Sequence, residues 1–281
     1  MAATWSILRR SPSAMIGLGI LIFFALMAVV GPPAIHYDAT ENPLQIYQPP
    51  SFAHLLGTDY AGRDVGGEVV VGSTPVLLVA VLVAVISVAI SIVVGMVAGF
   101  SGGAVDAALM RVADVFLTIP SFPLLVVLTG YLKVSDPLPM AGVLSIAAWA
   151  GLARAIRAQV LTLAQRDFVE AARIAGLSRT HIIFRELLPN MAPYIAMNFV
   201  LAFTGAIYAE VGLFLLGVAP FTATNWGVML NFAVTQAGAL YSTNSMWYLI
   251  APMTCIVLLQ VGSVLFVRAL EEVFNPRLRA A

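Results

Sequence analysis

Long intervals without a charged residue constrain this chain more than any other feature of its sequence. Between Glu186 and Arg268 the chain has one charge, Glu210, and between Glu68 and Asp106 it has none. Because a charged side chain at the centre of a bilayer costs about 2.5 kcal/mol or more, such intervals are typical of membrane-spanning helices. They predict six spans, near residues 14–30, within 68–106, and near 114–132, 138–156, 194–216 and 246–267.

The composition favours an all-α integral membrane protein. Of the 281 residues, 60% are apolar and 10% are charged, so a water-soluble fold would have too little polar surface. A net charge of zero with no basic stripe predicts no nucleic-acid partner. The lone Cys255 excludes an intramolecular disulfide. Pro120 and Pro123 predict a bend in the third span.

The distribution of basic residues predicts the orientation of the spans. With six crossings both termini lie on one side, and that side receives twelve of the 14 basic residues, all except Arg63 and Lys133. By the positive-inside rule both termini are expected in the cytoplasm. The apolar run after Arg9 and Arg10 is longer than the core of a secretion signal, so we interpret it as a retained first span. The chain is therefore expected to be a multi-pass protein of the cell membrane.

The loop between spans four and five, residues 165–190, is the most basic stretch of the chain. Asp167 followed by Glu170 has the spacing of a capping box, which predicts a helix from Phe168. Gly176 predicts a left-handed turn at its end. A second helix is expected to begin after a Ser178 cap and to end before the Leu188-Pro189 pair.

At these residues the loop resembles that of the membrane subunits of binding-protein-dependent ABC importers. Their pattern is Glu-Ala-Ala, three residues, Gly, nine residues, Ile, one residue, Leu-Pro; Glu186 stands here at the Ile position. The resemblance implies a type I importer fold in which the two short helices couple the spans to an ATPase subunit. The expected contact residues are Glu170, Ala171, Ala172, Gly176, Leu177, Ser178, Leu188 and Pro189.

Further motifs are similar to the second permease type of the dipeptide, oligopeptide and nickel transporter group. They include the run from His54 to Asp59 and the run from Asn225 to Leu230. The resemblance implies a tail, first span and outer loop at 1–67 and a five-span core at 68–281. It also implies contacts at the outer gate or with a binding protein for Asp59, Arg63, Asp64, Asn225 and Trp226. Because the segment after Asp64 departs from the group, the substrate stays open between peptides, oligosaccharides and nickel.

The sequence has neither a phosphate-binding G-x-x-x-x-G-K-[ST] loop nor an H-E-x-x-H zinc motif. We therefore expect a transport subunit and not an enzyme, with no cofactor of its own and with ATP and Mg²⁺ held by partners. The resemblance implies three kinds of partner besides lipid: a second permease, two ATP-binding subunits and an extracellular solute-binding protein.

Two more specific functions, a serine hydrolase and a secondary transporter, have less support in the sequence. Residues 99–103 fit the G-x-S-x-G pattern of serine hydrolases, but the three histidines all fall in predicted loops and no lysine lies in a predicted span, so the serine would lack a base. Glu210 could relay ions in a secondary transporter, but we find no internal repeat in the sequence and expect a hydrogen-bonded structural role.

Overall fold

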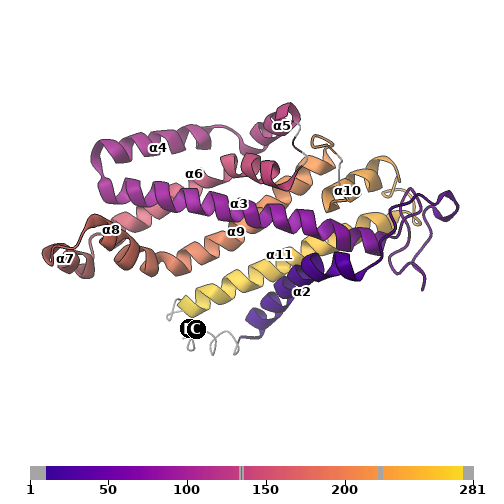
Figure 1. Cartoon of the computed structure of the whole chain (residues 1–281), viewed down its shortest axis with the longest axis horizontal. Coiled ribbons are helices and arrows are strands. Elements are labelled where there is room, and N and C mark those ends of the chain that lie inside the picture. The colour runs from indigo at the N-terminus through magenta and orange to yellow at the C-terminus, as the bar shows by residue number, and fades with distance from the viewer. Residues whose placement is uncertain (1–10, 133, 135, 221–223, 275–281) are drawn as a thin grey trace.

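The computed structural model describes residues 11–132, 134, 136–220 and 224–274, and these are almost entirely helical (Figure 1). Five helices have the length and composition of membrane spans, and the number reaches six when one bent pair of helices is counted as a single span. The predicted all-α membrane fold is thereby confirmed, and the six predicted spans agree with this count. They correspond to α2 (Pro12–Ala34), α3 (Val65–Ser101), α4 (Gly103–Thr118) with α5 (Ser121–Leu132), α6 (Pro137–Leu163), α9 (Leu188–Leu215) and α11 (Met246–Phe274).

Short helices lie at the two ends of this bundle (Figure 1). At one end are α7 (Asp167–Ile174), α8 (Arg179–His181) and the π-helical segment η2 (Ile182–Leu187). At the opposite end are the 3-10 turn η1 (Pro43–Gln45) and α10 (Trp226–Thr235). Arg9, Arg10, Lys133, Arg277 and Arg279, which contribute to the predicted orientation, lie outside the described residues.

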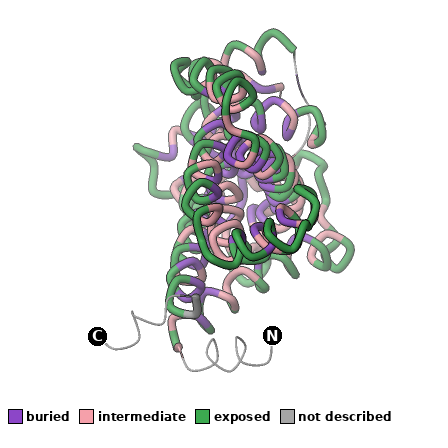
Figure 2. Tube along the Cα trace, turned by 90° about the vertical axis from the view of Figure 1, so that its left-hand side faces the viewer, coloured by how far each residue is buried: buried purple, intermediate pink, exposed green. Residues whose placement is uncertain are grey.

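Helix α3 forms the centre of the bundle, packed on α6 and α9, while α2 pairs with α11. Small residues allow α3 and α6 to approach closely. A Cβ atom added to Gly95 would lie 2.6 Å from the carbonyl oxygen of Ala153, and Ser91 donates a hydrogen bond of 2.7 Å to the carbonyl of Trp149. Figure 2 shows buried residues along the middle of the bundle and exposed ones around it. Many of the exposed residues are large and apolar, such as Ile16, Val93 and Val257, as a lipid-facing bundle requires.

The predicted bend in the third span is present at Pro120, but the helix before it begins earlier than the sequence predicts. Helices α4 and α5 meet at an angle of 82°. Because a residue before proline avoids the helical region, Ile119 is extended (φ −81°, ψ 125°), and Pro120 has no amide hydrogen to continue the ladder. At the other end α4 begins at Gly103 and not near Asp114. Its first turn contains Asp106, which accepts two hydrogen bonds from Arg157 of α6.

Candidate functional site

Helix α7 begins one residue before its predicted start, and the predicted capping box is absent. Asp167 is the first helical residue and Arg166 is the N-cap, without a side-chain cap bond. The prediction was wrong because Asp167 has already entered the helix, where its side chain cannot cap the amide three residues on. Asp167 and Glu170 still lie in the first turn, where negative charge stabilises a helix through its dipole.

The turn after α7 is as predicted. Gly176 is left-handed, with φ +73°. The amide of Leu177 donates to the carbonyl of Ala172 at 3.1 Å and that of Gly176 donates to Arg173 at 3.0 Å. This pair of bonds is a Schellman motif, which satisfies the last carbonyls of a helix and requires a residue that tolerates positive φ.

The second loop helix begins as predicted but does not end as predicted. The Ser178 hydroxyl accepts a hydrogen bond from the amide of His181 at 3.2 Å, so the cap is confirmed. The helix does not stop before Leu188-Pro189, because η2 joins α8 to α9 and residues 179–215 form one helical rod. In η2 the amide of Leu188 bonds the carbonyl of Ile183, five residues back. This wider winding lets Pro189, which cannot donate, follow without breaking the helix.

One face of helix α7 packs against the rest of the chain, and the opposite face is exposed. Val169 and Ala172 are buried in a cluster with Met96 of α3, Ile156 of α6 and Met191 of α9. This cluster attaches α7 to the ends of three long helices. The opposite side exposes most of the predicted contact residues, namely Glu170, Ala171, Gly176, Leu177, Ser178 and, farther along, Pro189. Of the other two, Leu188 is half-buried and Ala172 is buried.

The exposed side of α7 also includes an apolar residue that we did not identify from the sequence. Ile174 is 82% exposed at the end of α7, immediately before the Gly176 turn. Leu177, just after the turn, is also exposed (39%), so apolar side chains lie on both sides of the Gly176 turn. Arg173 lies beside Ile174, with its guanidinium 5.6 Å from the centre of the Phe100 ring.

At the opposite end of the bundle, Asp59 and Arg63 hold their own loop together. The Asp59 side chain is fully buried. It accepts bonds from the Arg63 Nη2 at 2.6 Å, from the Arg63 Nε at 2.8 Å, and from the amides of Ala61 and Arg63. Burial alone would lower the pKa of Arg63, but its bonds to Asp59 and the charge of Glu68 raise it, so Arg63 stays charged. Asp64 caps α3 by accepting from the amide of Gly67 at 2.6 Å.

Glu210, Asn225 and Trp226 join α10 to the bundle. The Asn225 side chain donates to Glu210 at 2.7 Å and accepts from the amide of Gly227 at 2.8 Å, which starts α10. The Trp226 indole donates to the carbonyl of Val69 in α3 at 2.9 Å. All three residues are buried, so they form internal bonds between α9, α10 and α3. The Oε1 of Glu210 accepts a hydrogen bond inside the bundle, as expected, but its Oε2 is buried without a hydrogen-bond partner among the described residues.

The fold and this site define a class: a polytopic helical membrane protein whose free, ordered surface is a loop at one end. Among the described residues we find no group of three or more His, Cys, Asp or Glu side chains that could hold a metal ion. The chain belongs to the family of binding-protein-dependent transport system inner membrane components, whose family profile matches residues 91–280. A second profile, the N-terminal TM domain of oligopeptide transport permease C, matches residues 1–50.

Individual relatives extend this similarity over nearly the whole chain. The chain is 31% identical over 273 residues to the oligopeptide transport system permease protein OppC of Bacillus subtilis (strain 168), covering 96% of this chain and 88% of that protein. It is 33% identical over 283 residues to the dipeptide transport system permease protein DppC of the same strain, covering 98% and 85%. OppC of Lactococcus lactis subsp. cremoris (strain SK11) is 31% identical, covering 83% and 79%.

Proposed function

We propose that this chain forms half of the channel of an ATP-driven importer, in the cell membrane, with both termini in the cytoplasm. The observation that carries the proposal is the exposed side of α7, from Glu170 to Ser178, attached to three long helices by a buried cluster. A rigid, protruding surface at the end of the spans is suited to receive force from a partner. Two ATP-binding subunits, which hold ATP and Mg²⁺, supply that force. The chain itself binds no cofactor and catalyses no reaction.

The cargo that we propose is peptides, which an external solute-binding protein delivers. The channel is formed together with a second permease. Relatives named for oligopeptide and dipeptide transport support this choice over oligosaccharides or nickel. Asp59, Asn225 and Trp226 are buried. We therefore propose that they act at the outer gate by fixing the shape of the surface. Because Arg63 and Asp64 are partly exposed, we propose that these two residues contact the binding protein.

The test is uptake by the reconstituted complex. The chain, its second permease, the ATPases and the binding protein are placed in vesicles, and uptake of labelled dipeptides and oligopeptides is measured with oligosaccharides or Ni²⁺ as competitors. ATP-dependent peptide uptake is the expected result. Uptake that persists without the ATPases and collapses with an uncoupler would instead show a secondary transporter. Competition by Ni²⁺ or sugar, but not by peptide, would change the cargo and keep the class.

A further inference from the structure

The bend between α4 and α5 leaves backbone groups without partners inside a membrane span. The carbonyls from Val115 to Thr118 would accept bonds from residues 119–122, where the helix has already ended. At the start of α5, Pro120 and Pro123 have no amide hydrogen, and the amide of Leu124 makes the first bond, to Pro120. Hydrocarbon cannot satisfy such groups, so irregular backbone at membrane depth occurs only against protein or water.

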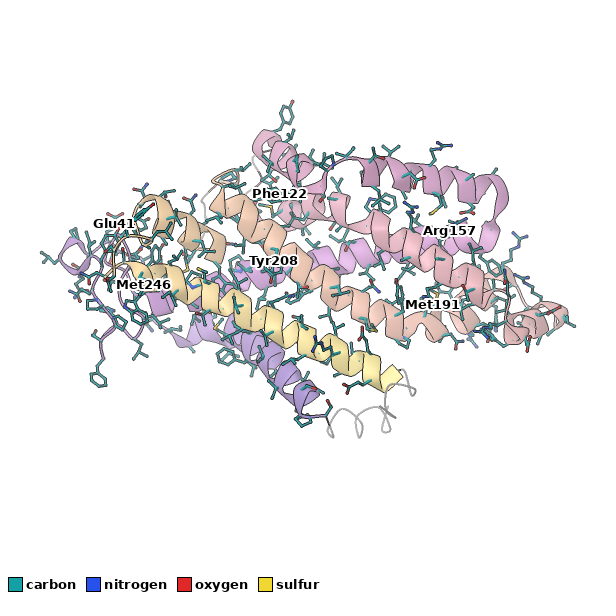
Figure 3. The ribbon with its side chains drawn as sticks, turned by 180° about the vertical axis from the view of Figure 1, so that it is seen from behind. Glu41, Phe122, Arg157, Met191, Tyr208 and Met246 are labelled. Atoms are coloured by element: carbon teal, nitrogen blue, oxygen red, sulfur yellow. The ribbon has the colours of Figure 1, made fainter. Side chains whose placement is uncertain are left out.

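This bend is also on the surface of the single chain. Every residue from Leu117 to Pro123 is exposed, and over α4 and α5 the buried residues are Ala113, Leu125 and Thr129. The Thr129 hydroxyl is buried without a hydrogen-bond partner. In Figure 3, Phe122 at the bend and Arg157 on α6 lie toward one edge of the bundle, whereas Met246 on α11 lies lower and toward the far end.

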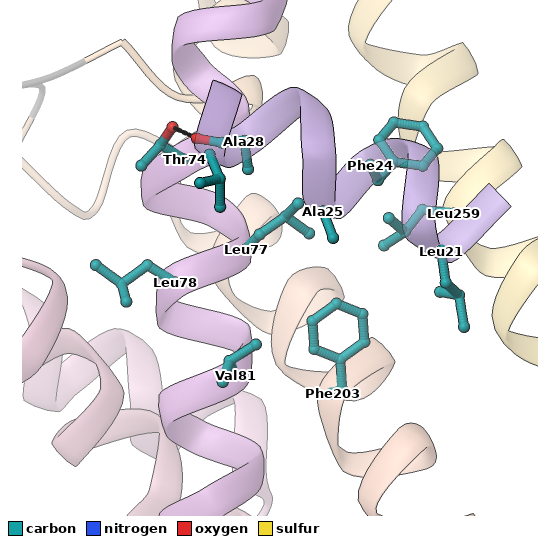
Figure 4. Close-up of a pocket in the computed structure, with 11 residues that line it drawn as sticks. Leu21, Phe24, Ala25, Ala28, Thr74, Leu77, Leu78, Val81, Phe203 and Leu259 are labelled. Carbon is teal, nitrogen blue, oxygen red and sulfur yellow. Dashed lines mark hydrogen bonds between the residues drawn. The ribbon is translucent and has the colours of Figure 1, made fainter. Parts of the chain in front are cut away.

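The opposite side of the bundle has the features of a lipid-facing surface. Between α2 and α3 is an apolar groove of about 300 Å³, lined by residues such as Leu21, Leu78 and Phe203 (Figure 4). Its polar residue, Thr74, donates its hydroxyl to the carbonyl of Ala28 at 2.6 Å. Helix α2 contains Pro32 and Pro33, which remove the amide donors for the carbonyls of Ala28 and Val29, and the Thr74 hydroxyl replaces the donor for Ala28. The carbonyls from Ala14 to Met27 keep their donors within the helix, so acyl chains can cover that stretch without leaving them unsatisfied.

The side chains at the bend distinguish a protein partner from water. Five apolar side chains near the bend are each at least 38% exposed, namely Val112, Val115, Leu117, Ile119 and Phe122. Such an apolar surface is poorly suited to line an aqueous path. Only a partner with apolar side chains and a few hydrogen-bond donors satisfies both these residues and the free carbonyls. We propose that the α4–α5 bend is the contact surface for the second permease subunit, which supplies donors to the carbonyls of Val115–Thr118.

This inference rests on the proposed function in requiring a second permease. Its test is photo-crosslinking in the assembled complex, with p-benzoyl-phenylalanine in place of Val115, which is 55% exposed, because the Phe122 ring lies against Gly212 of α9 in the same chain. The matched control is the same replacement at Phe23 of α2, which is 59% exposed. The probe captures whichever C–H group is nearest, so gel mobility and mass spectrometry of the adduct identify the neighbour.

We expect the Val115 variant to shift to a band containing both permeases, and the Phe23 variant to give lipid adducts. Lipid adducts at Val115, or no adduct there, would overturn the inference. Co-purification and ATP hydrolysis of each variant complex are measured in parallel. A complex that assembles and hydrolyses ATP but gives lipid adducts at Val115 refutes only the contact surface, whereas failure of any second permease to co-purify refutes the proposed function.

Discussion

Replacing Gly176 with alanine should weaken the attachment of the ATPase subunits through backbone strain alone. A Cβ atom at Gly176 would have no heavy atom within 4 Å, so the substitution causes no clash. Its cost is that of holding a residue with a side chain at φ +73°, about 1–2 kcal/mol. If α7 relieves that strain by leaving its position, the affinity of the complex falls roughly 5- to 30-fold.

The matched control is Gly19→Ala. Gly19 lies in α2 and also has no heavy atom within 4 Å of an added Cβ, but its backbone is helical. The assay is titration of the permease with purified ATPase subunits, together with transport-coupled ATP hydrolysis. Gly19→Ala should match the unmodified chain, and Gly176→Asn should lose less than Gly176→Ala because asparagine tolerates the left-handed region. Equal behaviour of Gly176→Ala and Gly19→Ala would refute the reasoning.

Three further changes test other parts of the structure. Arg63→Ala leaves the buried Asp59 without its guanidinium and should destabilise the chain by about 3–5 kcal/mol, measured by thermal unfolding and by protease cleavage of the 36–67 loop. Glu210→Gln keeps the acceptor for Asn225, so ATP-driven uptake in vesicles should be largely retained, with about 1 kcal/mol lost in stability. Ile174→Ser removes an exposed apolar side chain, so ATPase affinity should fall by about 1.5–3 kcal/mol while the melting temperature is unchanged.

Each of these has a clear contrary outcome. Unchanged stability and protease resistance after Arg63→Ala would show that the Asp59 pair does not order the loop. Arg154→Ala is its matched control, since the ion pair of Arg154 with Asp114 is exposed and should contribute less than about 1 kcal/mol. Uptake abolished by Glu210→Gln in a complex that still hydrolyses ATP would assign Glu210 to transport. Full ATPase affinity after Ile174→Ser would exclude Ile174 from the contact.

The positions of the spans could be predicted because burying a charge in lipid is costly, and that cost is visible in the sequence. The ends of the spans could not be predicted so well. Helix α4 begins before Asp106, because Asp106 pairs with Arg157, 51 positions later in the sequence. This pair holds the first turn of α4 against α6. Charge-free intervals cannot show such a pairing. The sharpness of the bend at Pro120 likewise depends on how α5 packs.

The loop and the outer residues show the same limit. The left-handed turn at Gly176 and the helix cap at Ser178 could be predicted, since each depends only on neighbouring residues in the sequence. The continuation of α8 into α9 was not, because a proline ordinarily suggests a helix boundary and only the π-helical winding of η2 avoids it. The burial of Asp59 was not predictable either, because it depends on the path of the whole 36–67 loop. Ile174 was missed because one apolar residue in a short helix resembles a core position.

We expect the rod formed by residues 179–215 to act as a lever. Its 37 residues extend about 55 Å, and it connects the capped turn at Ser178 to Glu210, the residue that holds α10. If a partner displaces the α8 end, a tilt of about 10° around the middle of the rod would carry each end through roughly 5 Å, in opposite directions. Displacement of the α8 end at one mouth of the channel would thus move α10 at the other mouth in the opposite direction. Distances between spin labels on α8 and α10, measured with and without ATP, would show whether the two ends move together.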